Sequence, residues 1–341
     1  MQVTSPPDST KAKGQVILTG IKPTDHPHIG NYLGAIRPGI DLVSHSSHSL
    51  LFIADYHAIT TVQDAKEMKD FTHSVAATWI ACGLDPKKTI IYRQSDVPDI
   101  FELAWILSCV TPKGLMNRAH AYKAKVQENQ DQQKDDPDFG ISMGLYSYPV
   151  LMAADILLFS SDIVPVGEDQ VQHVEIARDV AQKFNRVYGE ILKLPKHLVK
   201  TEEVIPGLDG RKMSKSYGNH IPLFLESKKL RKMVMKIVTD STPPEAPKET
   251  KGSILFSLYK SFATPEQTQA LEGLYREGVG WGEVKQMLFE RIEEHLKGPA
   301  EIYNDLMNNR KKIDDILADG GERARALAAP LMSKVRAAVR G

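Results

Sequence analysis

The sequence lacks the features that would place this 341-residue chain in a membrane or an oxidising compartment. It has only two cysteines, Cys82 and Cys109, and neither lies in a CxxC pair or near a metal-spaced histidine pair. Neither a zinc site nor a disulfide framework is therefore expected. No run approaches the roughly 20 apolar residues that a membrane-spanning helix needs. Residues 1–13 have no apolar stretch, so we predict a flexible leader, not a secretory signal, on a cytoplasmic protein with no membrane partner.

A net charge is also missing, because 43 basic residues balance 43 acidic ones. This balance argues against general nucleic-acid binding, which usually requires a positive surface. The positive charge is unevenly distributed, however. Ser227–Lys236 carries five basic residues and no acid, and the tail Glu322–Gly341 carries five against one acid. For both segments two interpretations stay open: local contacts with a polyanion, or solvated helix faces.

The first half of the chain alternates short β-rich runs with helical patterns, which is typical of an α/β domain with a parallel sheet. The predicted strands are Gln15–Thr19, Leu50–Ala54, Thr89–Tyr92 and Asp162–Val166; predicted helices begin near Asn31 and Gln170 and cover Phe71–Gly83, Phe101–Cys109 and Leu151–Phe159. The polar stretch 126–142 interrupts this pattern and is predicted to be a mobile surface insertion. Beyond Pro222 only helical patterns remain. We therefore predict a nucleotide-type domain over residues 14–222 and a mostly helical domain over 223–341.

The segment Thr19–Asn31, TGIKPTDHPHIGN, is the first candidate for a chemical role. It leaves a predicted strand, turns through Gly and Pro, and begins a helix, which directs backbone N–H groups toward a ligand above the strand. It has neither the G-x-G-x-x-G spacing of dinucleotide-binding proteins nor the G-K-[ST] of a P-loop. His28 can donate to phosphate oxygens, and Gly30 lets a flat base lie against the helix backbone. An H-x-G tripeptide alone is common by chance.

The second candidate is the glycine-bounded segment Gly210–Tyr217, GRKMSKSY. Its two lysines, Lys212 and Lys215, alternate with hydroxyl side chains and suit a mobile clamp on a triphosphate. Nucleotidyl transfer needs positive charge on the leaving pyrophosphate more than it needs a protein nucleophile. Taken alone, the segment is better explained as a solvated basic turn.

Together, the HIGN and KMSKS segments resemble the paired signatures of class I aminoacyl-tRNA synthetases. That resemblance implies a Rossmann-like catalytic domain in which an amino-acid carboxylate attacks the α-phosphate of ATP, giving an aminoacyl-adenylate and pyrophosphate. It implies Mg²⁺ held mainly through the ATP phosphates, and transfer of the aminoacyl group to the terminal ribose of a tRNA. Catalysis would proceed by positioning and charge neutralisation, without a covalent enzyme intermediate.

Asp155 is a carboxylate inside an otherwise apolar helical run, Tyr148–Phe159. An unpaired buried charge is costly, so Asp155 requires a partner. The partner is either a helix cap or core hydrogen bond, or a donor on a ligand, such as an indole N–H or a phenol O–H. A site that pairs such a donor rejects analogues that lack it. Asp155 alone does not choose between indole and phenol.

This run and the following one, DIVPVGEDQVQHVE (162–175), closely resemble bacterial tryptophanyl-tRNA synthetases. The similarity extends to Gly30–Ala35, Asp55–Thr60 and Val238–Ser241 and covers nearly the whole chain beyond the leader. It implies L-tryptophan as the amino acid, tRNA(Trp) as the partner, and a homodimer whose helical domain meets the anticodon. The alternatives are tyrosine activation and a non-catalytic synthetase-like protein; the intact polar residues of both motifs argue against the second.

The same resemblance assigns roles to individual residues. In the tryptophan pocket, Asp155 would accept the indole N–H, Met152 would pack on the ring, Tyr148 and Gln170 would hold the α-amino group, and His57 would lie near the carboxylate. ATP would be lined by Lys22, Pro23, Thr24, Gly30 and Asn31, then Gly167, Glu168 and Asp169 near ribose and adenine, backbone near Val204, and the loop residues Lys212, Met213, Ser214, Lys215 and Ser216. The catalytic residues would be His28, Asn31, Lys125, Lys212 and Lys215. Each also has a plainer explanation, with Met152 as core, Lys125 as surface and Tyr148 as a buried aromatic.

Residues 22–25 form the turn that the resemblance places against ATP, here called the ATP loop. Two of them depart from the family pattern. Asp25 stands where a glycine is usual, and Lys22 where a glutamine often stands. Aspartate tolerates the left-handed backbone better than most residues, so we expect the turn to survive with Asp25 in place of glycine. We expect Lys22 to offset the extra negative charge.

Overall fold

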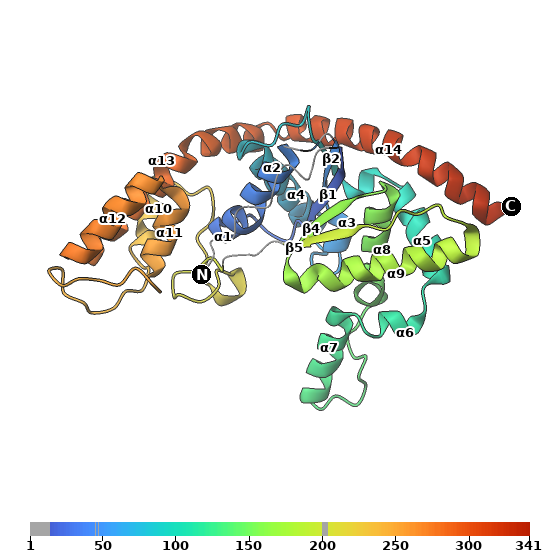
Figure 1. The fold of residues 1–341 in the computed structure, drawn as a ribbon, viewed down its shortest axis with the longest axis horizontal. Helices are drawn as coiled ribbons and strands as arrows, with labels where there is room; N and C mark the ends of the chain where they lie inside the picture. The colour runs from blue at the N-terminus through green and yellow to red at the C-terminus, as the bar shows by residue number, and fades with distance from the viewer. Residues whose placement is uncertain (1–13, 45, 47, 200–203) are drawn as a thin grey trace.

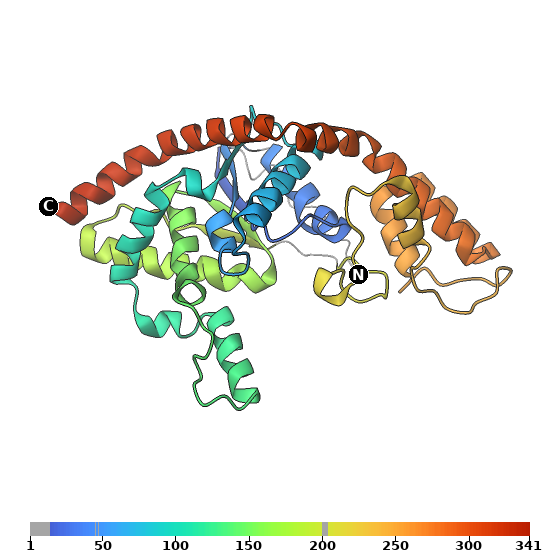
Figure 2. The ribbon, with the colours of Figure 1, turned by 180° about the vertical axis from the view of Figure 1, so that it is seen from behind.

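The computed structural model describes residues 14–44, 46, 48–199 and 204–341. The leader predicted at 1–13 lies outside the described residues. Figure 1 shows an elongated molecule, with a sheet covered by helices in one part, a group of helices at one end, and a long C-terminal helix that arches over the sheet. The same arrangement is seen from behind in Figure 2. Within the described ranges, no helix is both long and apolar enough to cross a membrane.

The sheet has five parallel strands in the order β3-β2-β1-β4-β5. They are β1 (Val16–Ile21), β2 (His48–Ile53), β3 (Ile90–Arg93), β4 (Ile163–Val166) and β5 (Lys196–Val199). Strands β2 and β3 follow β1 on one side of the sheet. Strand β4 then pairs with the other side of β1, so the direction of strand addition reverses there. In open α/β sheets the crevice outside the carboxyl ends of the strands, at such a switch point, is where ligands bind.

The helices divide into those around the sheet and those beyond it. Around the sheet lie α1 (Ile29–Asn31), the π-helical turn η2 (Tyr32–Ile36), α2 (Arg37–Ser44), α3 (Asp55–Ala58), α4 (Ala65–Ala81), η3 (Gln94–Asp96), α5 (Asp99–Val110), α6 (Lys113–Met116), α7 (His120–Asp131), α8 (Met143–Leu158), η4 (Glu168–Gln170) and α9 (Val171–Tyr188). After β5 follow η5 (Lys215–Tyr217), α10 (Ser227–Val234), α11 (Ile254–Phe262), α12 (Pro265–Glu277), α13 (Trp281–Asn308) and α14 (Arg310–Arg340). Among the described residues no strand follows β5, as the helical patterns beyond Pro222 predicted.

The predicted Rossmann-like α/β fold is confirmed, and all four predicted strands are present with small shifts at their ends. The fifth strand, β5, was missed. It is a four-residue edge strand in which three residues are exposed, and its sequence is KHLV. Hydrophobic periodicity identifies strands that bury a face, so a short exposed edge strand gives no such signal.

The polar stretch 126–142, predicted to be a mobile surface insertion, is helical in its first part, because α7 continues to Asp131. Gln and Glu are good helix formers, and this local preference overrides the absence of an apolar stripe. The following turn is held by Asn129, which is 1% exposed and donates through its amide to the carbonyls of Pro137 and Phe139, each at 2.8 Å. These two hydrogen bonds from the buried amide hold the turn after α7 against the helix.

The C-terminal helix α14 packs against the edge strand β3 and covers that side of the sheet (Figure 1). Its buried residues at helical spacing, Ala324, Ala328, Met332 and Val335, join the core that contains Leu50 and Tyr92. The basic tail is used within the molecule at three places: Arg323 bonds the Pro86 carbonyl, Arg325 the Asp96 carbonyl, and Arg336 pairs with Asp99 and Glu102. Residues 223–341, which were predicted to form a separate helical domain, therefore include a helix that packs into the core of the sheet domain.

Replacing Gly320 by alanine should destabilise the protein by about 1–3 kcal/mol, because an added methyl group overpacks a backbone contact. A Cβ at this position would lie 1.7 Å from the carbonyl oxygen of Ile91, on the edge strand that α14 covers. Gly273→Ala in α12 is the matched control, since its Cβ would meet nothing within 4 Å. That variant should gain up to about 1 kcal/mol from the better helix former. Urea unfolding of both variants checks the pair, and equal stabilities would contradict the assigned contact.

Candidate active site

A cavity of about 590 Å³ lies at the carboxyl ends of β1, β2 and β4, at the switch point of the sheet. Apolar side chains such as Leu18, Phe52, Trp79 and Val164 form much of its wall. Eight of the predicted site residues also line it: Lys22, Asn31, His57, Tyr148, Met152, Gly167, Asp169 and Gln170. Apolar walls with a few convergent polar groups are typical of a small-molecule site.

The HIGN motif forms a reciprocal cap at the start of α1. The His28 Nδ1 accepts the backbone N–H of Asn31 at 3.3 Å, and the Asn31 Oδ1 accepts the backbone N–H of His28 at 3.1 Å. Burial, together with the neighbouring charges of His220 and Lys215, lowers the pKa of His28 to about 4. The imidazole is therefore neutral near pH 7, with Nδ1 as an acceptor and Nε2–H as the remaining donor. This tautomer suits a hydrogen bond to an anionic oxygen.

The two sequence motifs touch. The backbone N–H of Gly30 points to the Sδ of Met213 at 3.2 Å, and Met213 is buried. A side chain at Gly30 would crowd this contact, because its Cβ would lie 2.9 Å from the His28 ring and 3.2 Å from the Met213 Cβ. Residues far apart in the chain are thus packed into one unit, with the KMSKS loop against the first motif.

The side chain of Asn219 holds the KMSKS loop in place through several hydrogen bonds. Its amide nitrogen donates to the Asp209 carboxylate at 2.7 Å and to the Lys212 carbonyl at 3.1 Å, while its Oδ1 accepts the backbone N–H of Ser214 at 2.8 Å. The hydroxyls of Ser214 and Ser216 bond each other at 2.8 Å. Asn219 is 3% exposed, so the loop has a buried anchor, whereas Lys212 is exposed and Lys215 is partly exposed.

Asp155 is fully buried and already has protein partners. Its Oδ2 accepts from the His57 Nε2 at 2.8 Å, and the Gln94 amide donates to both of its oxygens at 2.9 and 3.0 Å. Burial raises the pKa of the Asp155 carboxyl, while these hydrogen bonds oppose the shift. The core hydrogen bond considered from the sequence is thus present. Gln94 was not predicted as a site residue, although a polar residue directly after a strand's carboxyl end is a usable signal.

His173 joins the two residues expected to hold the α-amino group and was not identified from the sequence. Its Nε2 lies 2.6 Å from the Tyr148 hydroxyl, and its Nδ1 lies 2.9 Å from the Gln170 Oε1. Since Gln170 Oε1 can only accept, the Nδ1 donates and the Nε2 accepts from Tyr148. The Gln170 amide in turn donates to Asp169 at 2.8 Å. The spacing of Gln170 and His173 at the start of α9, three residues apart, could have indicated this pairing.

Stability should fall as the pH drops from about 6.5 to about 4, because His28 and His173 resist protonation in the folded state. Burial is the main cause that lowers the pKa of each to about 4. The unfolded chain takes up these protons near pH 6.5, so each histidine should remove up to about 1.4 kcal/mol per pH unit in that window. Urea unfolding between about pH 7 and about pH 5, with His173→Gln beside the wild-type chain, measures this slope. The variant should lose less stability on acidification; an unchanged slope would exclude His173 as a cause.

Lys125 and Val204 lie neither in the lining of this cavity nor in the two motif segments. Lys125 lies on α7, which projects from the body of the molecule (Figure 1), and pairs with Glu128 at 3.0 Å. Val204 is 63% exposed on the segment that leads to the KMSKS loop and does not line the cavity.

The turn of the ATP loop survives, as expected, but it needs no left-handed residue, and Lys22 does not offset the charge of Asp25. Among the described residues the only non-glycine positions with positive φ are Gln133 and Ser160, so Asp25 does not adopt the left-handed conformation. The charge of Asp25 is offset by Lys215 at 2.5 Å, while the Lys22 ammonium lies 5.2 Å from the centre of the Tyr148 ring. The turn instead closes with a hydrogen bond from the Thr24 N–H to the Lys22 carbonyl. This bond does not require a positive φ at Asp25.

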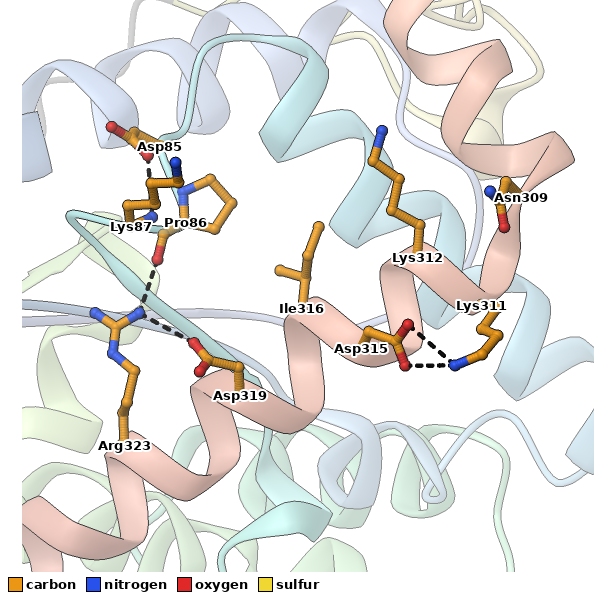
Figure 3. Close-up of a pocket in the computed structure, with 10 residues that line it drawn as sticks. All are labelled: Asp85, Pro86, Lys87, Asn309, Lys311, Lys312, Asp315, Ile316, Asp319 and Arg323. Atoms are coloured by element: carbon orange, nitrogen blue, oxygen red, sulfur yellow. Dashed lines mark hydrogen bonds and ion pairs between the residues drawn. The ribbon is translucent and has the colours of Figure 1, made fainter.

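A larger hollow of about 830 Å³ lies between the turn before β3 and the first half of α14 (Figure 3). Its charges are largely paired with one another, Lys311 with Asp315 at 2.9 Å and Arg323 with Asp319 at 3.4 Å. It lies at the amino end of β3, away from the carboxyl ends of the strands where both motifs meet. We therefore assign it no part in the chemistry of the site.

The parallel sheet with this strand order, a histidine motif after its first strand and a lysine–serine loop after its last, defines a class I aminoacyl-tRNA synthetase fold. The family model described as tRNA synthetases class I (W and Y) matches residues 10–297, and the chain belongs to this family. The class inferred from the two motifs is therefore confirmed.

Similar proteins are bacterial tryptophan–tRNA ligases. The chain is 50% identical over 325 residues to that of Neisseria meningitidis, covering 95% of this chain and 97% of the relative, and 50% identical over 327 residues to that of Xanthomonas axonopodis, covering 95% and 76%. A crystal structure of tryptophanyl-tRNA synthetase from Campylobacter jejuni, in complex with ADP and tryptophan, has a TM-score of 0.88 at 43% identity and covers 96% of this chain and 100% of its own. The predicted resemblance to bacterial tryptophanyl-tRNA synthetases is confirmed.

Proposed function

We propose that this chain is a tryptophan–tRNA ligase of the cytoplasm. It activates L-tryptophan with ATP, giving tryptophanyl-adenylate and pyrophosphate, and then transfers tryptophan to the 3'-terminal ribose of tRNA(Trp). The observation that supports this most is the junction of an apolar cavity, lined by His57, Met152 and Tyr148, with the paired motifs packed through Gly30 and Met213. Asn31 of the first motif also lines this cavity, so the apolar pocket adjoins groups suited to binding phosphate.

Asp155 is proposed as the acceptor of the indole N–H. A carboxylate offers about four acceptor positions. Oδ2 receives both His57 and Gln94, whereas Oδ1 receives Gln94 alone, which leaves it able to accept one more donor. Met152, three residues earlier on α8, lines the cavity and would pack on the ring.

The amino-acid carboxylate and ATP are proposed to meet beside the HIGN cap. Tyr148 and Gln170, both fixed by His173, would orient the α-amino group, and the neutral His28 would donate to a phosphate oxygen. Lys212 and Lys215 would neutralise the leaving pyrophosphate. Mg²⁺ would be held mainly by the ATP phosphates; within the described residues no group of three His, Cys, Asp or Glu side chains could hold a metal, so the cation would arrive with the nucleotide. When bound, it neutralises phosphate charge.

Amino-acid-dependent exchange of ATP with pyrophosphate is the direct test. Purified protein is assayed with tryptophan, tyrosine and phenylalanine in parallel, and exchange with tryptophan alone is expected. Exchange with tyrosine would retain the reaction class and overturn the substrate. Loss of exchange with all three would leave an aromatic-ligand or partner-binding protein on a synthetase fold.

A homodimer is proposed through an apolar surface on α3 and α5. Trp105 is 73% exposed, Tyr56 46% and Ile59 47%, and Tyr56 packs on Phe101 with ring centres 4.7 Å apart. Exposed aromatic groups of this kind mark protein interfaces. With two subunits, tRNA would enter one active site while the helical part of the other meets the anticodon, and basic α10 would contact its phosphates. Sedimentation should show a dimer for the wild-type chain and a monomer for Trp105→Glu.

A further inference from the structure

An ion pair connects the two motif loops across the cleft. The Lys215 Nζ lies 2.5 Å from the Asp25 Oδ1, and the same oxygen accepts the backbone N–H of His26 at 2.7 Å. Asp25 belongs to the turn before His28, and Lys215 begins the short helix η5 in the KMSKS loop. The ion pair therefore holds the turn before His28 against the KMSKS loop.

Among the described residues, Asp25 is the carboxylate that pairs with Lys215. Both residues line a cavity of about 510 Å³, in which Asp25 is the only carboxylate among the lining residues, all of which are described. The pKa values of His28 and His220 are lowered, first by burial and then by neighbouring charges that include Lys215. An imidazole is either neutral or positively charged, so neither ring can balance the charge of the lysine.

A nucleoside triphosphate brings several negative charges to the same lysine. It competes with Asp25 for the Lys215 ammonium, and the Asp25 carboxylate repels it. We infer that Asp25 is a built-in counter-ion that holds the KMSKS loop against the ATP loop before nucleotide binds, and that the triphosphate must displace it. The inference deepens the proposed function, on which it rests for the identity of the ligand. Asp25 is thus a positioning residue that acts through Lys215 and limits the affinity for the triphosphate.

The size of the effect follows from the exposure of the pair. The Asp25 side chain is 45% exposed and that of Lys215 27%, so solvent screens much of their attraction. Ion pairs of this kind change an equilibrium by about 2- to 10-fold. An effect in this range is measurable by titration and leaves the fold intact.

The experiment is a double-mutant cycle read by equilibrium binding. The dissociation constant of an ATP analogue with a methylene bridge between its α- and β-phosphates is measured by calorimetry for the wild-type chain, Asp25→Asn, Lys215→Ala and the double variant. Asparagine keeps the shape of Asp25 and the acceptor for the His26 N–H. Asp70→Asn is the matched control, because Asp70 lies beside His26 and pairs with Arg310, not with Lys215.

Asp25→Asn should bind the analogue about 2- to 10-fold more tightly, and this gain should vanish in the Lys215→Ala background. AMP, which lacks the β- and γ-phosphates, should bind the wild-type chain and Asp25→Asn alike. An equal gain with and without Lys215 would indicate simple repulsion of the phosphates and overturn the inference. So would unchanged or weaker binding by Asp25→Asn, or an equal gain in Asp70→Asn. Tryptophan-dependent exchange by the wild-type chain tests the proposed function separately, since binding of the analogue does not require it.

Discussion

Asp155→Ala should lower kcat/KM for tryptophan in the exchange reaction by about 10²-fold or more, because a charged hydrogen bond to the substrate is removed from a buried site. The binding of an ATP analogue should change little, since the hydrogen-bond partners of Asp155 are His57 and Gln94, which belong to neither motif. The carboxylate also holds His57 and Gln94, both within 3.0 Å. Removing it leaves two buried donors without an acceptor, which should cost about 3–5 kcal/mol of stability. The measurements are exchange kinetics and urea unfolding.

A substrate analogue separates recognition of the indole N–H from damage to the pocket. In benzothienylalanine a sulfur atom replaces the N–H with little change in ring shape. The wild-type chain should use it about 10²-fold less well than tryptophan. Asp155→Asn, which retains most of the side-chain volume, should lose most of this discrimination. If the variant still discriminates as strongly as the wild-type chain, another group accepts the indole N–H and the role proposed for Asp155 is wrong.

The sequence predicted the elements that bury one face and failed where burial is slight. β1 and β2, whose apolar residues face both layers of helices, were recognised from short runs such as Leu50–Ala54. β5 is exposed, and α7 carries few apolar residues, so neither leaves a periodic pattern. The packing of α14 on β3 depends on Gly320 and small residues that permit close approach, and such residues carry no information about their distant partner.

The candidate site was predicted in outline because its residues lie in continuous motifs after strand ends. Eight of them reach one cavity, and Gly30 meets Met213 as two motifs of one site should. The partners of these residues were not predicted. Gln94 and His173 act through other side chains, and the charge of Asp25, which Lys22 was expected to offset, is paired with Lys215. Hydrogen bonds between residues distant in the chain depend on the packed geometry, which local patterns do not encode.

Lys215→Ala should lower kcat of tryptophan-dependent exchange by about 10²–10³-fold, as removal of a positioned charge or donor at a developing anion does elsewhere. The lysine lies at the junction of the two motifs, on a loop anchored by Asn219, where charge on a departing pyrophosphate would develop. Because that charge grows in the transition state, the loss should appear in kcat more than in KM for tryptophan. Lys215→Arg should recover only part of the rate, since a planar guanidinium replaces a compact ammonium.

Arg211→Ala is the matched control in the same loop. Arg211 carries the same charge, is 60% exposed and pairs with Asp209 at 2.6 Å, away from Asp25. Its removal should change kcat by less than about threefold, as expected for an exposed ion pair. Steady-state exchange kinetics with both substrates varied distinguish the two variants. Equal losses in Arg211→Ala and Lys215→Ala would mean that the loop contributes only its general positive charge, and a rise in KM for ATP at constant kcat would limit Lys215 to binding the ground state.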